Sequence, residues 1–168
     1  QAVDLYRLLS GLPGLKAAGL HAYDGHIHDH DLIVRKQKCD EAYRGVTYMI
    51  EEISCFHPGK TEVVAGGSPT FPIHAAREGV ETSPGTVLLW DYGYGTGFSD
   101  MKYLCAAVLL SRIISKPADD LICIDLGHKA VASEMPHPRV KLCGFDRYEF
   151  VAHNEEHLVV RLPEARIM

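Results

Sequence analysis

The chain has 168 residues, of which 46% are hydrophobic and 23% charged, so it is long and apolar enough for one packed domain or for parts of two. Its formal net charge is −5 and it contains no basic run, which argues against nucleic acid and membrane surfaces as partners. Its five cysteines are scattered and form no CxxC pair, as is typical of reduced thiols. We therefore expect a cytoplasmic protein.

The first half of the chain alternates between strand-like and helix-like patterns. Apolar residues recur at helical spacing after Asp31, which is placed to cap that helix. This alternation predicts parallel βα units. The expected helices are 2–9 and 31–56, the expected strands are 19–23, 61–67 and 85–94, and 68–78 is expected to be a loop with at most one helical turn.

The second half has a different pattern. Short apolar segments, rich in β-branched residues, are separated by proline, glycine and aspartate, and no helical periodicity lies between them. This predicts an antiparallel β-domain, with one domain over 1–95 and the other over 96–168. The expected β-rich segments are 106–115, 120–127, 148–154 and 156–162.

The sequence AGGSPTF places two glycines, Ser68 and Thr70 directly after a predicted strand. Glycine lets the backbone approach an anion, so Gly66 and Gly67 make this a candidate phosphate loop. The alternative is an ordinary strand-to-loop break. A second glycine-rich stretch, GYGTG at 93–97, lacks a Walker lysine and is expected to be a turn.

The sequence YDGHIHDH contains three histidines, His26, His28 and His30. Read as a strand end, it puts His26 and His28 on one face, where amidohydrolases bind a catalytic metal. The same stretch could also form the rim of a different kind of active site, or a polar turn before a helix. The isolated His74 and His137 are expected at the surface, and the charged groups of IDLGHKA and NEEHLVV at sheet edges or strand ends.

Six stretches together resemble one family, the D-threonine aldolase-like and D-serine dehydratase-like enzymes with the alanine-racemase fold. In chain order they are GLHAYDGHIHD, AGGSPTFP, WDYGY, AAVLLSRIISKP, IDLGHKA and NEEHLVV. The resemblance implies α/β plus β architecture: the C-terminal half of a (β/α)8 barrel, followed by the start of an antiparallel β-domain. The chain would then be a piece of a longer protein, catalytically inert by itself.

The resemblance also implies roles at matching positions. Gly66, Gly67, Ser68 and Thr70 match the loop that holds the phosphate of pyridoxal 5'-phosphate, and Tyr23 resembles the tyrosine that lines its ring. The catalytic base would be one of the three histidines, with His26 and His28 as our candidates and His28 favoured. The lysine that binds the cofactor would lie outside this chain, as would the residues that hold a divalent metal (Mn, Mg or Zn).

The implied activity is the cleavage of D-β-hydroxy amino acids to glycine and an aldehyde by a homodimeric lyase. Elimination of water from D-serine is a second outcome that the same machinery could give. The histidine turn also leaves open a metal-dependent hydrolase that uses His26 and His28 as ligands. The fold further leaves open a non-catalytic carrier of pyridoxal phosphate.

Overall fold

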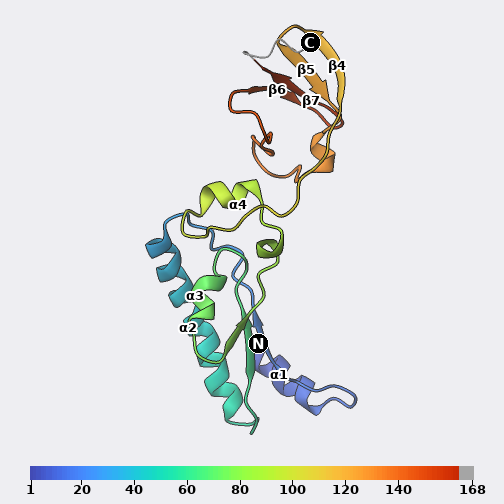
Figure 1. Cartoon of the computed structure of the whole chain (residues 1–168). Helices are drawn as coiled ribbons and strands as arrows, with labels where there is room; N and C mark the ends of the chain where they lie inside the picture. The colour runs from blue at the N-terminus through green and yellow to red at the C-terminus, as the bar shows by residue number, and fades with distance from the viewer. Residues whose placement is uncertain (163–168) are drawn as a thin grey trace. The chain divides into compact units, whose positions relative to one another are not determined.

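The computed structural model describes residues 1–162 and divides the chain into two compact units, the second of which begins at Ala107 (Figure 1). The sequence placed this division at residue 95. The difference arises because residues 96–106 pack with the first unit, where Phe98 and Met101 form a buried cluster with Trp90. Of the helices within residues 1–162, none is long and apolar enough to cross a membrane.

The first unit contains a three-stranded parallel sheet in the order β1-β2-β3. β1 and β2 pair in register from Gly19–Glu62 to Ala22–Ala65, and β3 joins the far side of β2. This arrangement of consecutive parallel strands agrees with the expected βα units. The elements are α1 (Ala2–Gly11), β1 (Gly19–Ala22), α2 (Leu32–Ser54), β2 (Glu62–Ala65), α3 (Phe71–Ala75), β3 (Val80–Thr82), η1 (Thr86–Leu88) and α4 (Tyr92–Gly97).

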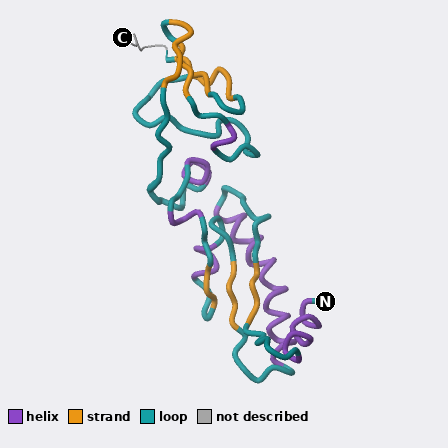
Figure 2. Tube along the Cα trace, turned by 90° about the vertical axis from the view of Figure 1, so that its right-hand side faces the viewer, coloured by secondary structure: helices purple, strands orange, loops and turns teal. Residues whose placement is uncertain are grey.

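The long helix α2 covers the sheet, as Figure 2 shows. Its apolar positions recur at helical spacing, so they lie on one face of the helix, and this face packs against the strands. Val46 packs against Val63 and Ala65 of β2 in one buried cluster. The predicted cap is confirmed: the carboxylate of Asp31 accepts a hydrogen bond of 2.9 Å from the backbone N–H of Val34. The sheet and α2 thus form the frame that carries the loops at the strand ends.

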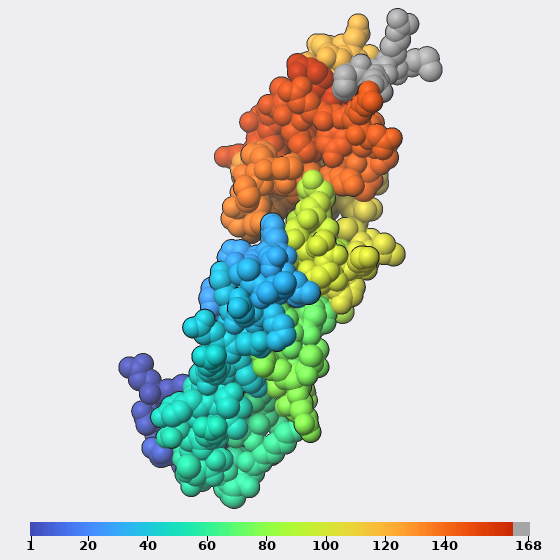
Figure 3. Space-filling model, turned by 90° about the vertical axis from the view of Figure 1, so that its left-hand side faces the viewer, coloured from blue at the N-terminus to red at the C-terminus, as the bar shows by residue number. Residues whose placement is uncertain are grey.

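The N-terminal helix α1 lies beside the end of α2, where Figure 3 shows the first residues (dark blue) against those near residue 55 (teal). Tyr6 is buried there, and its ring meets Phe56 and His57 edge-on at centroid distances of 6.3 and 5.5 Å. Aromatic burial therefore fixes this end of the unit, away from the carboxyl ends of the strands.

Two expectations for residues 85–97 were wrong. The expected strand 85–94 is instead η1 followed by the start of α4, and the expected turn 93–97 is part of α4. Trp90 adopts the left-handed conformation, with φ of 53°, which breaks any extended run. Asp91 then caps α4 by accepting a hydrogen bond of 2.7 Å from Tyr94 N–H.

The second unit is an antiparallel sheet in the order β4-β5-β7-β6, which confirms the expected antiparallel character of this half. Residues 106–112 carry no strand, although they were expected to be β-rich. One face of the sheet buries the cluster Ile122, Ile124, Leu126, Leu158, Val160 and Leu162. The elements are β4 (Ile113–Ala118), β5 (Leu121–Ile124), η2 (His128–Ala130), β6 (Glu149–His153) and β7 (Leu158–Arg161).

The IDLGHKA and NEEHLVV segments meet in this unit. The backbone N–H groups of His128 and Lys129 donate to the carbonyls of Asn154 and Glu155, at 2.9 and 3.2 Å. A Cβ at Gly127 would lie 1.9 Å from the Glu155 carbonyl oxygen, so only glycine allows this approach. The charged groups near Lys129 therefore line a backbone contact at the strand ends.

Candidate functional site

The histidine turn, residues 23–30, follows β1 and has an inner and an outer side. The N–H of Ile27 donates to the Asp24 carbonyl at 2.8 Å, which closes the turn. Asp24 and Ile27 are buried, whereas His26 and His28 are exposed. The turn is not a continuation of the strand, yet both histidines face solvent on either side of buried Ile27. Their side chains make no hydrogen bond to any described residue.

The third histidine of the turn differs from the other two. The His30 ring packs edge-on against Phe98, with centroids 5.5 Å apart. Arg35, fully buried in the first turns of α2, donates to the carbonyls of Asp29 and His30 at 2.8 and 3.2 Å and pairs with Asp100 at 2.5 Å. The end of the histidine turn is therefore anchored to α2 and to the region after α4.

The glycine loop, residues 66–70, follows β2 and lies beside the histidine turn. Gly66 has φ of +82°, and a Cβ there would lie 2.8 Å from the His74 ring. A Cβ at Gly67 would lie 3.0 Å from the ring of Tyr23, which is 72% exposed. Gly66 therefore requires glycine for its backbone conformation and for its close approach to His74, whereas Gly67 lies against the exposed ring of Tyr23. The ends of β1 and β2 meet here, as parallel strands dictate.

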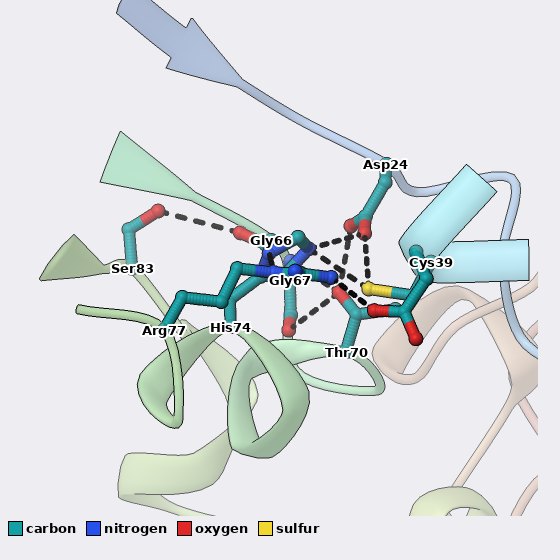
Figure 4. Close-up of polar contacts among 9 residues, drawn as sticks. Asp24, Cys39, Gly66, Gly67, Thr70, His74, Arg77 and Ser83 are labelled. Atoms are coloured by element: carbon teal, nitrogen blue, oxygen red, sulfur yellow. Dashed lines mark hydrogen bonds and ion pairs between the residues drawn. The ribbon is translucent and has the colours of Figure 1, made fainter. Parts of the chain in front are cut away.

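Thr70 links the glycine loop to the histidine turn (Figure 4). Its hydroxyl donates to Asp24 Oδ1 at 2.6 Å, and the hydroxyl oxygen accepts the Gly67 N–H at 3.1 Å. Thr70 is fully buried, so these bonds form away from water. The hydroxyl proton of Thr70 is therefore committed to Asp24 and faces the interior of the unit.

His74 forms a hydrogen bond with the second carboxylate oxygen of Asp24, with Nε2 2.9 Å from Oδ2. The expectation of a surface position for His74 was wrong, because its side chain is 3% exposed. Burial opposes charge on the ring, but the hydrogen bonds to Asp24 and Cys39 outweigh it and raise the pKa of His74 to about 9. Burial likewise opposes ionisation of Asp24, but its bonds to His74 and Thr70 lower its pKa.

Arg77 continues the chain of contacts behind His74. Its Nε–H points to His74 Nδ1 at 3.3 Å, and its Nη2 pairs with Asp40 of α2 at 2.5 Å. A ring nitrogen accepts a hydrogen bond only through its lone pair, so this contact favours a ring with its hydrogen on Nε2 alone. The raised pKa favours the doubly protonated ring. In both forms Nε2 carries a hydrogen that it donates to Asp24.

Three side chains of this region could be arranged around a metal. Ligand atoms of Asp24, Cys39 and His74 lie within 4.8 Å of one another, and the Cys39 sulfur is 3.1 Å from His74 Nε2. Zinc accepts this combination of ligands. However, coordination by Nε2 would move the ring hydrogen to Nδ1, where the Arg77 Nε–H already points. Hydrogen bonding accounts for the convergence without a metal.

The remaining loop residue, Ser68, is buried and oriented differently from Thr70. Its Oγ accepts the Thr86 N–H at 3.0 Å, which leaves the hydroxyl proton available. Its own N–H donates to no acceptor within residues 1–162. Gly66 and Gly67, in contrast, direct their N–H groups to Ala22 O and the Thr70 hydroxyl. Ser68 thus supplies the free donors of this loop.

The two segments that the sequence singled out lie at neighbouring strand ends, but the residues that join them were not predicted. The sequence patterns assigned no role to Asp24, Cys39 or Arg77 and predicted a surface position for His74. One signal was available: Thr70 and His74 are four residues apart at a predicted helical turn, which puts them on one face. Their partner Asp24 lies about fifty residues earlier, and no local pattern reveals that pairing.

Comparisons with known proteins point to one group of enzymes. A sequence model described as "Putative serine dehydratase domain" matches residues 106–167. A D-threonine aldolase of Arthrobacter sp is 29% identical over 161 residues, which make up 90% of this chain and 40% of that protein. The crystal structure of D-threonine aldolase from Filomicrobium marinum matches with a TM-score of 0.81 at 23% identity, over 96% of this chain and 44% of that one. The chain thus spans less than half the length of either relative.

Proposed function

We propose that the chain belongs with the D-threonine aldolase-like and D-serine dehydratase-like proteins that it resembles, and that it forms part of a pyridoxal-phosphate-dependent lyase for D-β-hydroxy amino acids. The chain would contribute the later strands of a (β/α)8 barrel and the opening of a β-domain. The observation that carries the proposal is the glycine loop with buried Ser68, held beside Tyr23 where β1 and β2 end. Ligands of parallel α/β folds bind at this end of the strands.

The residues of the loop fit a phosphate group in part. The N–H and hydroxyl of Ser68 are free to donate, whereas the N–H groups of Gly66 and Gly67 are already bonded within the unit. The exposed ring of Tyr23 beside Gly67 offers a flat surface for a pyridine ring. Thr70 does not fit as a direct phosphate ligand, because its hydroxyl is bound to Asp24. We therefore assign phosphate contact to Ser68 and an indirect role to Thr70.

The cofactor, when bound, would take up the electron pair released as the substrate bond breaks. This chain would supply the proton acceptor for the substrate hydroxyl. His26 and His28 suit that role because both are exposed and free of hydrogen bonds, whereas His30 packs against Phe98. Histidine exchanges protons near neutral pH, as a general base must. We favour His28, whose neighbour Asp29 is fixed through its carbonyl by Arg35.

Further parts of the enzyme are proposed to lie outside these 168 residues. Neither Lys60 nor Lys129 lies in a setting suited to bind the cofactor, and Lys129 is paired with Glu155 and Glu156. Among residues 1–162, the group of Asp24, Cys39 and His74 is buried and already hydrogen-bonded, so it offers no open position for a catalytic metal. The lysine and the metal ligands would come from the rest of a homodimeric, cytoplasmic protein, and the chain alone would be inactive.

The second candidate is elimination rather than retro-aldol cleavage. The match to a serine dehydratase domain over residues 106–167 favours it. One substrate distinguishes the two outcomes. D-threonine cleaved between its α and β carbons gives glycine and acetaldehyde, whereas loss of water followed by hydrolysis gives 2-oxobutanoate and ammonia.

The test is to express the full open reading frame, add pyridoxal phosphate and manganese, and analyse the products from D-threonine and L-threonine. We expect glycine and acetaldehyde from the D enantiomer alone, and a loss of roughly 10²–10⁴-fold in rate for His28→Asn. His137→Asn is the matched control, because His137 lies exposed in the second unit. Formation of 2-oxobutanoate would select elimination. Absence of both products, with zinc-dependent hydrolytic activity lost in His26→Asn, would overturn the proposal.

A further inference from the structure

We infer that Asp24 is a positioning residue that fixes the glycine loop to the histidine turn. The inference rests on the proposed function for the identity of the bound ligand. The link itself rests on side chains that come from three places in the fold: the turn after β1, the loop after β2 and helix α3 (Figure 4).

The carboxylate of Asp24 is fully used inside the unit. One oxygen accepts the Thr70 hydroxyl at 2.6 Å and the other accepts His74 Nε2–H at 2.9 Å. Asp24 is only 7% exposed, so water does not compete for these bonds. A buried carboxylate with two fixed donors holds one orientation, and it therefore fixes the donors relative to the turn that carries it.

Thr70 transmits this orientation to the loop backbone. A hydroxyl has one proton, and here it is given to Asp24, so the oxygen lone pairs are left for the Gly67 N–H at 3.1 Å. The Gly67 amide is thereby turned inward. The next amide and hydroxyl, those of Ser68, remain free to donate. The direction in which the loop presents its donors is thus set by the pair of Asp24 and Thr70.

His74 and Arg77 support the carboxylate from behind. Arg77 contacts the His74 ring and pairs with Asp40, which ties α3 to α2. The Arg77 guanidinium also lies 4.3 Å from the centroid of the Tyr43 ring. The Asp24 carboxylate, which accepts from the glycine loop, is therefore anchored to α2, the longest helix of the unit. Movement of the glycine loop would require breaking hydrogen bonds in the interior of the first unit.

The same residue fixes the other half of the site. The Asp24 carbonyl closes the histidine turn by accepting the Ile27 N–H, while its side chain holds the glycine loop. Consequently the exposed His26 and His28 and the free donors of Ser68 are carried by segments joined at one residue. A base and a phosphate site that act on one substrate need such a fixed separation.

The test compares Thr70→Val, Thr70→Ser and Asp24→Asn in the protein from the full open reading frame. Thr47→Val is the matched control, because its hydroxyl bonds only a carbonyl of its own helix at the surface. Hydrogen–deuterium exchange over residues 64–71 should accelerate in Thr70→Val and return toward wild type in Thr70→Ser. Asp24→Asn should also accelerate exchange, because Thr70 and His74 donate to different oxygens of Asp24 and one of these becomes an NH2 group that cannot accept.

The second readout is the dissociation constant for pyridoxal phosphate. It should rise roughly tenfold in Thr70→Val, recover in Thr70→Ser and stay unchanged in Thr47→Val. Unchanged exchange in Thr70→Val would overturn the inference. So would tight zinc binding that Cys39→Ser abolishes, because the cluster would then be a metal site. If the wild-type protein binds no pyridoxal phosphate, the proposed function fails, while the exchange experiment still decides the role of Asp24.

Discussion

Replacement of Arg35 by methionine should destabilise the first unit strongly. Its guanidinium is fully buried and makes three hydrogen bonds, to the carbonyls of Asp29 and His30 and to the carboxylate of Asp100. Methionine retains the aliphatic stem and the helix propensity, so the change removes mainly these bonds and the contact with the Phe98 ring, whose centroid lies 4.8 Å away.

Loss of one partner of a buried ion pair costs about 3–5 kcal/mol. The lower end, about 3 kcal/mol, applies here, because the Asp100 side chain is 21% exposed and can regain water. The charged guanidinium also leaves its own Nε unbonded in the native protein, which lowers what the pair contributes.

Urea unfolding followed by tryptophan fluorescence measures this effect. Trp90 is the single tryptophan of the sequence, and it is buried in the cluster that includes Phe98. Lys36→Met is the matched control, since Lys36 is the next residue of α2 but forms only an exposed pair with Asp40. We expect a large shift in midpoint for Arg35→Met and almost none for Lys36→Met. Equal midpoints for both variants would refute the reasoning.

Three further predictions concern pH and glycine. Because the pKa of His74 is raised, its pair with Asp24 stabilises the protein fully below about pH 6.5 and loses this contribution as the pH rises toward 9, while the lowered pKa of Asp24 preserves stability above about pH 4. The difference in urea midpoint between wild type and His74→Gln, measured against pH, should follow this window. A difference that does not change with pH would contradict the prediction. Gly127→Ala should disrupt the second unit, because the new Cβ would lie 1.9 Å from the Glu155 carbonyl oxygen, and an unaltered circular dichroism spectrum and melting curve would contradict this. Gly45→Ala, exposed in α2 with open space around it, should stabilise the protein by about 1 kcal/mol, and a lowered urea midpoint would count against that assignment.

The elements that the sequence predicted well are those whose signal is local. Helix α2 has more than three turns of apolar periodicity and a capping aspartate, and both features act within a few residues. The predicted strand at residues 85–94 was wrong because an apolar run of this length suits a strand or a helical segment equally. The left-handed Trp90, whose side chain packs on Phe98 and Met101, decides the outcome through contacts further along the chain.

The candidate site divides in the same way. Glycines after a strand and alternating histidines after another are local patterns, and the structure places both segments at neighbouring strand ends. The exposure of His26 and His28 follows from the burial of Ile27 between them. The inward role of Thr70 and the burial of His74 could not be predicted, because each depends on a tertiary partner, Asp24, that the sequence gives no reason to select.

The most direct test of the central claim is the visible absorption spectrum of the protein from the full open reading frame, purified with pyridoxal phosphate and then treated with borohydride. We predict an absorption band of protein-bound cofactor that borohydride removes, and a weaker band with faster loss of the cofactor in Ser68→Ala. A colourless wild-type protein that instead retains zinc through His26 and His28 would contradict the account.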